Sequence, residues 1–251
     1  MGSPLIQFLG TGNAFNTDGR GTQSVLFAPG SASPFLVDLG PTSVQAMVRF
    51  DVDWRKIDRL FLTHLHGDHT AGWPFLLLNM VVLDRRTRPF DVYGPEGTRA
   101  ALEGLGEICF RDVLERQSFD IRYHELPVAE QMDVQGRQGM QFDVLPMEHH
   151  PTSVGYRFHV DGCTIGVTGD TGWCDSLEQV AEGCDVLIAE CTSVQAETKT
   201  HLCLDEIRAG RERLGQGQIL LIHLSDAVAE ELARDPAPNL LAAYDGMIFL
   251  P

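Results

Sequence analysis

Four potential metal ligands lie within six consecutive residues of this chain, from His64 to His69. The segment has the sequence HLHGDH and lies between an apolar strand-like run and an expected helix. Side chains of an extended segment alternate, so His64 and His66 point the same way and can bind one metal ion. Gly67 permits a turn, after which Asp68 and His69 can face a second ion. Imidazole and carboxylate ligands favour Zn²⁺, with Fe²⁺ or Mn²⁺ as alternatives.

Most of the nine histidines, including those of this segment, lie near residues that could share a site with them. Seven of the nine belong to this class: His64, His66, His69, His149, His150, His201 and His223. His124 and His159 look incidental. The competing interpretation is a loop of solvated or helix-capping histidines. Three histidines and an aspartate between a strand and a helix favour metal binding instead.

The segment from His64 to His69 resembles the H-x-H-x-D-H signature of the metallo-β-lactamase superfamily. Further matches follow in the family's order, at Pro146–Arg157, Ile165–Thr171 and Leu220–Ser225. They resemble the segments that carry a ligand histidine before a Gly-Tyr pair, the metal-bridging aspartate and the last ligand histidine. The resemblance extends from Leu9 to Gly246, which is nearly the whole chain.

The resemblance implies a dinuclear site with two divalent metal ions. Its ligands would be His64, His66 and His149 on one ion, Asp68, His69 and His223 on the other, and Asp170 as the bridge. His150 stays open as an alternative to His149, which has the better spacing to the Gly-Tyr pair. Two ions about 3.5–4 Å apart can lower the pKa of a bridging water towards 7, and Asp68 would accept its proton. Asp38 either supports a ligand histidine or serves as a local turn carboxylate.

Several features resemble the ribonuclease Z-like, phosphodiesterase branch of the superfamily. They are the glycine-rich loop from Leu9 to Asn13, the segment Arg20–Ser24, Gly155-Tyr156-Arg157 and the ending Asp245-Gly246. Glu190 and His201 match a glutamate and a histidine that help to protonate the leaving oxygen in that branch. A phosphodiester would benefit from such a general acid. The competing interpretations are a strand-end carboxylate for Glu190 and a helix-entry residue for His201.

Two features argue against tRNA maturation. The tRNA-processing members carry an arm between the Gly-Tyr strand and the aspartate strand, where this chain has only Arg157–Gly169 and an Asp161-Gly162 hairpin. The chain has 35 Asp and Glu against 19 Lys and Arg, a net charge of −16 with histidine counted neutral. Such a surface should repel long nucleic acids and anionic membranes. The basic cluster Arg85–Arg88 either caps a helix or, as the minority interpretation, binds phosphate.

We therefore expect a metal-dependent hydrolase acting on a small phosphodiester, such as a cyclic nucleotide, a dinucleotide or a phosphonate-derived ester. A lactonase or thioesterase using the same metals is the first alternative. A non-catalytic, metal-loaded metabolite sensor is the second. The fold alone does not choose among these functions.

The elements that must position these residues are short strands alternating with helices. Strands are expected at 5–9, 24–27, 35–38, 59–62, 90–93, 119–123, 140–145, 154–160, 163–168, 186–189 and 218–223. Helices are expected at 42–50, 73–84, 98–115, 176–181 and 204–214. This order predicts an α/β fold with two mixed β-sheets packed face to face and helices outside. We expect an αββα sandwich, with residues 1–251 as a single domain.

The apolar runs and the cysteines indicate in which cellular compartment the protein is expected. The longest apolar run, Trp73–Leu83, is about half of a membrane span and contains Pro74 and Asn79. The six cysteines form no C-x-x-C pair, and we identify no secretory signal. These features predict a cytoplasmic protein with reduced thiols and no membrane partner. A homodimer stays open.

Overall fold

Two β-sheets pack face to face in the computed structural model, which describes residues 3–15, 19–127, 132–135 and 140–251. Within these ranges each sheet has seven strands. The first sheet contains, in spatial order, β14 (Ile248–Phe249), β1 (Leu5–Gly10), β2 (Ser24–Ala28), β3 (Phe35–Val37), β4 (Arg59–Phe61), β5 (Phe90–Pro95) and β6 (Ile121–Leu126). The second contains β13 (Leu240–Ala242), β12 (Gln218–Ile222), β11 (Val186–Glu190), β10 (Cys163–Val167), β9 (Val154–Val160), β8 (Gln141–Pro146) and β7 (Met132–Gln135).

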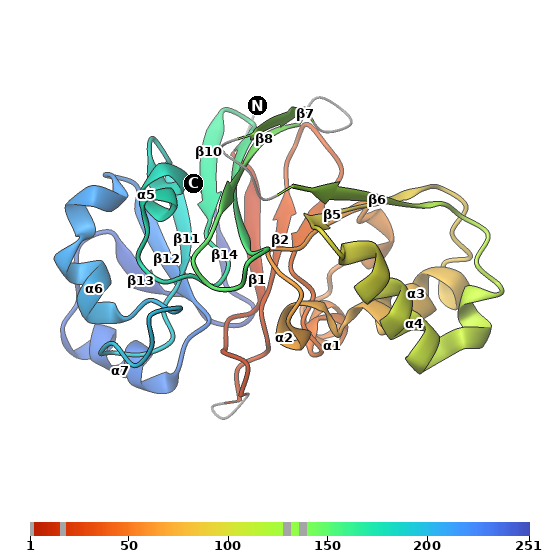
Figure 1. Cartoon of the computed structure of the whole chain (residues 1–251), viewed down its shortest axis with the longest axis horizontal. Helices are drawn as coiled ribbons and strands as arrows, with labels where there is room; N and C mark the ends of the chain where they lie inside the picture. Colours follow the sequence, from red (N-terminus) through yellow and green to blue (C-terminus); the bar gives the residue numbers. More distant parts are fainter. Residues whose placement is uncertain (1–2, 16–18, 128–131, 136–139) are drawn as a thin grey trace.

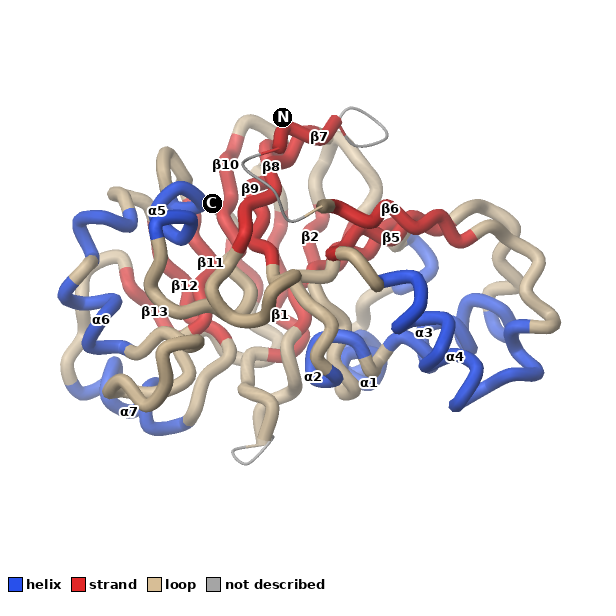
Figure 2. Tube along the Cα trace, viewed as in Figure 1, coloured by secondary structure: helices blue, strands red, loops and turns tan. Residues whose placement is uncertain are grey.

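Helices cover the outer side of both sheets (Figures 1 and 2). Beside the first sheet lie α1 (Ser43–Arg49), α2 (Gly67–Thr70), α3 (Trp73–Leu78) and α4 (Thr98–Leu114). Beside the second lie α5 (Asp175–Ala181), α6 (Leu204–Ala209) and α7 (Asp226–Arg234). The expected αββα sandwich is confirmed. Among the described residues, no helix combines the length and the apolar character needed to cross a membrane.

Side-chain alternation along the strands builds the apolar layers. Val25 and Phe27 of β2 pack between the sheets, whereas Leu26 packs on the helix side with Met47 of α1. The second sheet does the same, because Ile188 lies in the central layer and Leu187 packs against the outer helices. The inner strands of each sheet are therefore buried on both faces, and their ends are the parts left to form a site.

The strand ends that carry the predicted ligands meet at one edge of the sandwich. Strands β3 to β5 are parallel, and so are β10 to β12. The sheets are joined at this edge by a hydrogen bond from Val154 N to Thr63 O (2.9 Å). The buried hydroxyl of Tyr156 donates to Leu62 O (2.7 Å), two residues before His64. The end of β4 is thus held against the start of β9.

Some expected elements differ from the observed ones. The helix expected at 73–84 ends at Leu78 and continues as a π-helical turn, Asn79–Leu83, whose last two residues are exposed. The helix expected at 204–214 is interrupted at Gly210, where the Trp173 ring leaves no room for a Cβ atom. The strand expected at 119–123 begins at Ile121 and ends at Leu126. The sequence did not predict α2, β7, β13, β14 or α7.

Candidate metal centre

Three histidine rings from two distant segments converge beside the end of β4. His64 and His66 follow this strand, and His149 lies in the turn before β9. The Nδ1 atom of His66 lies 3.1 Å from Nε2 of His64 and 3.2 Å from Nε2 of His149. The ligand atoms of the three rings all lie within 4.8 Å of one another, which is compatible with binding one ion.

A second group combines two histidines and two aspartates. Asp68 and His69 belong to α2, Asp170 follows β10, and His223 follows β12. The Nε2 atom of His69 lies 3.2 Å from Asp68 Oδ2 and 3.4 Å from Asp170 Oδ1. The Nε2 atom of His223 lies 3.3 Å from Asp68 Oδ2 and 3.4 Å from Asp170 Oδ2. This set offers two nitrogens and two carboxylates at one point.

Asp170 lies between the two groups. Its Oδ2 atom is 3.8 Å from Nε2 of His64 and 3.9 Å from Nε2 of His149, in addition to its contacts with the second group. Gly169 positions this aspartate, because its φ of +60° falls in the left-handed region. A Cβ atom on Gly169 would also lie 2.6 Å from the Cβ of Thr63. The carboxylate is therefore well placed to face two ions at once.

The His69 ring has the environment of a metal-binding imidazole. Its Nδ1 donates to Asp38 Oδ2 at 2.8 Å, while its buried Nε2 has no hydrogen-bond partner and faces two carboxylates. Asp38 also accepts from the backbone N–H of Thr63 (2.8 Å), so its carboxylate joins two distant segments and does not serve a local turn. A carboxylate on the far nitrogen commonly orients a ligand imidazole. The residues present fit divalent metal ions.

The charges in this centre shift its pKa values in opposite directions. Burial opposes the charged form of His69, but Asp170 and Asp38 outweigh it and hold the His69 pKa well above its ordinary value. Burial likewise opposes the ionised form of Asp170, yet His223 and His69 keep the Asp170 pKa well below its ordinary value. Burial lowers the pKa of His64 to about 2, with the charge of His69 adding to the effect. The carboxylates thus favour cations at the second group.

Glu190 and His201 form a pair beside the metal centre. Glu190, at the end of β11, is 1% exposed and accepts from His201 Nδ1 at 2.7 Å and from Thr171 N at 2.9 Å. The His201 ring lies 4.7 Å from the His149 ring, centroid to centroid. Burial raises the pKa of Glu190. Burial would lower the pKa of His201, but its hydrogen bond with Glu190 raises it overall.

Thr192 contacts both Glu190 and His223, although the sequence predicted no role for it. Its hydroxyl lies 2.9 Å from Nδ1 of His223 and 3.0 Å from Glu190 Oε2. The available signal was the Glu190-Cys191-Thr192 spacing, since residues two apart in an extended segment share a side. A threonine has many other roles in strands, so the spacing alone carries little weight.

The other candidate residues are not members of the described ligand groups. His150 is exposed, its Nδ1 is 3.2 Å from Thr152 Oγ1 in the same turn, and its ring centroid is 6.1 Å from that of His66. His124 and His159 pair instead with Asp91 and Asp143. In the basic cluster, buried Arg86 bonds Asp58 (2.6 Å) and the carbonyls of Ile57, Arg88 and Pro89. These contacts use the guanidinium of Arg86 to hold neighbouring segments together, and they do not support phosphate binding by this residue.

The glycine-rich loop is tied to the end of the chain. Asp245 accepts hydrogen bonds from Thr11 N (3.0 Å), Thr11 Oγ1 (2.8 Å) and Gly21 N (2.6 Å). Leu224 N in turn donates to Thr11 O at 2.9 Å. The loop therefore lies directly beside Leu224, the residue that follows His223, and connects that segment to Asp245.

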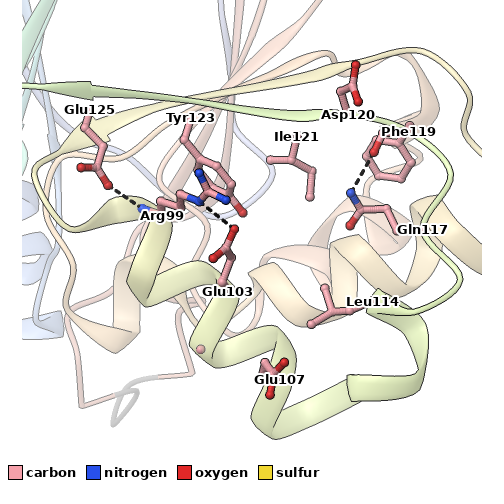
Figure 3. Close-up of a pocket in the computed structure, with 11 residues that line it drawn as sticks. Arg99, Glu103, Glu107, Leu114, Gln117, Phe119, Asp120, Ile121, Tyr123 and Glu125 are labelled. Atoms are coloured by element: carbon pink, nitrogen blue, oxygen red, sulfur yellow. Dashed lines mark hydrogen bonds and ion pairs between the residues drawn. The ribbon is translucent and has the colours of Figure 1, made fainter.

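An open cavity of about 980 Å³ lies elsewhere, between α4 and the edge strand β6 (Figure 3). Its polar lining pairs mostly with itself, as in the bonds from Arg99 to Glu103 Oε1 (2.9 Å) and to Glu125 Oε1 (2.8 Å). None of the predicted metal ligands or acid residues lines it. The candidate chemistry therefore belongs to the strand-end edge of the sandwich.

Comparisons with known proteins match this fold. A family model described as "Anti-Pycsar protein Apyc1" matches residues 5–243. The chain is 28% identical over 246 residues to ribonuclease Z of Mycobacterium bovis (strain BCG / Pasteur 1173P2), covering 89% of this chain and 86% of that protein. These matches confirm the predicted ribonuclease Z-like resemblance.

Solved structures agree with the sheet arrangement. The metallo-β-lactamase fold protein YhfI from Bacillus subtilis superposes with a TM-score of 0.78 at 20% identity, covering 100% of both chains. A diphosphatase of the PhnP family superposes with a TM-score of 0.73 at 22% identity, covering 98% of this chain and 97% of that chain. They confirm the metallo-β-lactamase fold.

Proposed function

Because the chain belongs to the family of the Anti-Pycsar protein Apyc1, we propose that this metallo-β-lactamase-fold hydrolase is a metal-dependent phosphodiesterase for small substrates. The observation that carries the proposal is the Glu190–His201 pair, in which buried Glu190 accepts a 2.7 Å hydrogen bond from His201 beside the histidine and aspartate groups. The names ribonuclease Z and diphosphatase both denote cleavage of phosphate-containing bonds, which supports the same class of chemistry.

We assign two divalent ions, most simply Zn²⁺, to the two groups. His64, His66 and His149 would hold one ion, Asp68, His69 and His223 would hold the other, and Asp170, which lies near both groups, would be shared. Ions bound there would supply an activated water and an electrophilic contact for substrate oxygens. The choice of Zn²⁺ follows from the mixture of imidazole and carboxylate ligands, which Mn²⁺ and Fe²⁺ also accept.

Two protein groups then carry out the proton transfers. Asp68, whose Oδ2 lies 3.2 Å from His69 Nε2, accepts the proton of the attacking water. His201, held by Glu190 and with its pKa raised, carries a proton that it donates to the leaving oxygen. Asp38 holds the His69 ring in place throughout.

Two observations favour a small phosphodiester, such as a cyclic nucleotide or a dinucleotide, over a long nucleic acid. Strands β9 and β10 are joined directly by the Asp161-Gly162 turn, so no arm extends from this point. The net charge of −16 opposes sequence-independent binding of a polyanion. We also infer that residues 1–251 act as one domain, because the layer between the sheets includes both Ile6 and Ile222.

The test is a panel of cyclic and linear phosphodiesters, lactones and thioesters, assayed on the metal-loaded protein. We expect phosphodiester turnover that is lost on chelation. His201→Ala should lower the rate about 10²–10⁴-fold on esters with alkoxide leaving groups. Its effect on nitrophenyl esters should be smaller, since nitrophenolate needs less protonation.

The control is His159→Ala, a histidine paired with Asp143 outside the site, which should keep both rates. Lactone or thioester turnover far above that of every phosphodiester would refute the proposal in favour of a carbonyl-ester hydrolase. Tight binding of a metabolite with no turnover of any ester would indicate a sensor instead.

A further inference from the structure

Thr192 occupies a junction of three segments that each carry a site residue. It lies two residues after Glu190, and its backbone N–H donates to Leu202 O (3.2 Å), next to His201. The preceding N–H, of Cys191, donates to Ile222 O (2.9 Å), next to His223. Its backbone position is therefore set by hydrogen bonds to the residues next to those two histidines.

The hydroxyl of Thr192 is near Glu190 and His223, and more distantly near His201 Nδ1 (3.4 Å), whose proton goes to Glu190 at 2.7 Å. A hydroxyl has one proton to donate and two lone pairs to accept with. Glu190 already accepts from His201 Nδ1 and Thr171 N on Oε1, so the Thr192 proton completes the carboxylate at Oε2 (3.0 Å). The hydroxyl oxygen is then free to accept from Nδ1–H of His223 at 2.9 Å.

This arrangement selects the useful orientation of the His223 ring. With its proton on Nδ1, the ring presents Nε2 to Asp68 Oδ2 (3.3 Å) and Asp170 Oδ2 (3.4 Å), on the side of the proposed metal ion. Hydrogen bonds on the far nitrogen commonly fix the tautomer and orientation of a ligand histidine. A carboxylate plays this part for His69, and a threonine hydroxyl is in the equivalent place for His223.

We propose that Thr192 is a positioning residue, which orients His223 for metal binding and at the same time holds Glu190 for His201. The inference rests on the proposed metal site. One hydroxyl joins the ligand side of the centre to the leaving-group side, so its removal should disturb both. A residue that only fills space would affect neither when replaced by a side chain of the same shape.

The test compares Thr192→Val, which keeps the shape without the hydroxyl, with Thr192→Ser, which keeps the hydroxyl. Zn²⁺ affinity is measured by competition with a chromophoric chelator, and Co²⁺-substituted protein gives a spectrum of the coordination. Thr192→Val should bind the ion of the His223 group about 10–100-fold more weakly and change the Co²⁺ spectrum. Thr192→Ser should retain the wild-type affinity and spectrum.

Thr164→Val is the matched control, because Thr164 lies on β10 near the opposite end of the sheet, with its hydroxyl 3.3 Å from His159. It should behave as the wild type. In the rate assays, Thr192→Val should lose more activity on alkyl than on nitrophenyl phosphodiesters. If Thr192→Val matched Thr164→Val in affinity, spectrum and leaving-group dependence, the inference would be wrong.

Two further outcomes separate the inference from the proposed function. A wild-type protein that binds metal without hydrolysing any phosphodiester, together with weakened binding in Thr192→Val, would refute the function and support the positioning role. A wild-type protein that binds no divalent ion would overturn both. Should Thr192→Val fail to fold, ring-nitrogen NMR of the metal-loaded wild type decides, since a His223 Nδ1 without a proton contradicts the inference.

Discussion

At the scale of single residues, two adjacent histidines have different surroundings. The side chain of His149 is 8% exposed, and its Nε2 lies 3.2 Å from His66 and 3.9 Å from Asp170. Its Nδ1 is 3.1 Å from the carbonyl of Thr200, which fixes the ring from the far side. The His150 ring is exposed and lies beside Thr152, with its centroid 6.1 Å from that of His66. The turn before β9 therefore brings the His149 ring nitrogen, and not that of His150, within hydrogen-bond distance of His66.

This difference predicts the metal content of two variants. His149→Ala should lose the ion bound by His64 and His66, because two imidazoles remain where three converged. His150→Ala should keep both ions. Metal per chain is measured by elemental analysis after dialysis against buffered Zn²⁺. If His149→Ala kept the full content and His150→Ala lost an ion, the ligand assignment would have to be exchanged.

At the scale of elements, the start of β4 is anchored by a buried cation. The Arg86 side chain is fully buried and pairs with Asp58, the residue before β4, at 2.6 Å. Arg88 pairs with the same carboxylate at 2.9 Å. Burial would raise the pKa of Asp58, but the hydrogen bonds from Arg88 and Arg86 lower it overall. Since β4 ends just before His64, this anchor supports the site from the opposite end of the strand.

Asp58→Asn should lower the free energy of unfolding by about 3 kcal/mol at neutral pH, because a buried guanidinium loses its charged partner. A carboxyl whose pKa is lowered by folding adds stability above its ordinary value and loses it as the pH falls through the folded value. The difference between wild type and variant should therefore shrink below pH 3.8. Urea unfolding across this range measures it.

Glu103→Gln is the control for that measurement. Glu103 forms an exposed pair with Arg99 on α4, and such pairs contribute about 0–1 kcal/mol. It should change stability little at any pH. An Asp58→Asn variant as stable as Glu103→Gln would mean that the carbonyls around Arg86 suffice to hold it.

At the scale of the whole molecule, both sheets contribute to the centre, so metal binding should stabilise the sandwich as a unit. His64 and Asp68 come from the first sheet, and Asp170 and His223 come from the second. An ion that binds only the folded chain stabilises it by an amount that grows with the logarithm of its free concentration over Kd, about 4 kcal/mol near 1,000 Kd. Chelation should lower the unfolding temperature accordingly.

The effect of chelation should grow with pH. The raised pKa values of His69 and His223 mean that their protons stabilise the metal-free fold below pH 6.5, and that this stability is lost as the pH rises through the folded values. Metal binding needs the same rings neutral, so it improves over that range. Calorimetry with and without chelator should give a difference in unfolding temperature that increases above pH 6.5.

Asp170→Asn is the control for the calorimetry, because it removes the carboxylate shared by both groups. The unfolding temperature of this variant should differ little with and without chelator at every pH. Equal unfolding temperatures for the wild type with and without chelator would count against a structural role for the metal ions.

The sequence by itself determined the local parts of this site and the type of fold. His64, His66, Asp68 and His69 lie within one strand-to-helix junction, where short-range geometry dictates how they point. Alternating apolar strands and intervening helices likewise determine the layers, since each sheet must bury its faces. The resemblance to a known family supplied the order of the distant segments that complete the set.

Only the tertiary structure decided which distant groups meet and how. The Asp38–His69 bond, the contact of His149 with His66, and the shared contacts of Thr192 depend on segments that are far apart in sequence. Arg86 shows the same limit, because a basic run looks alike in sequence whether it faces solvent or is buried against Asp58. Periodicity describes one element at a time, whereas these contacts depend on sheet order and register, which arise when the whole chain packs.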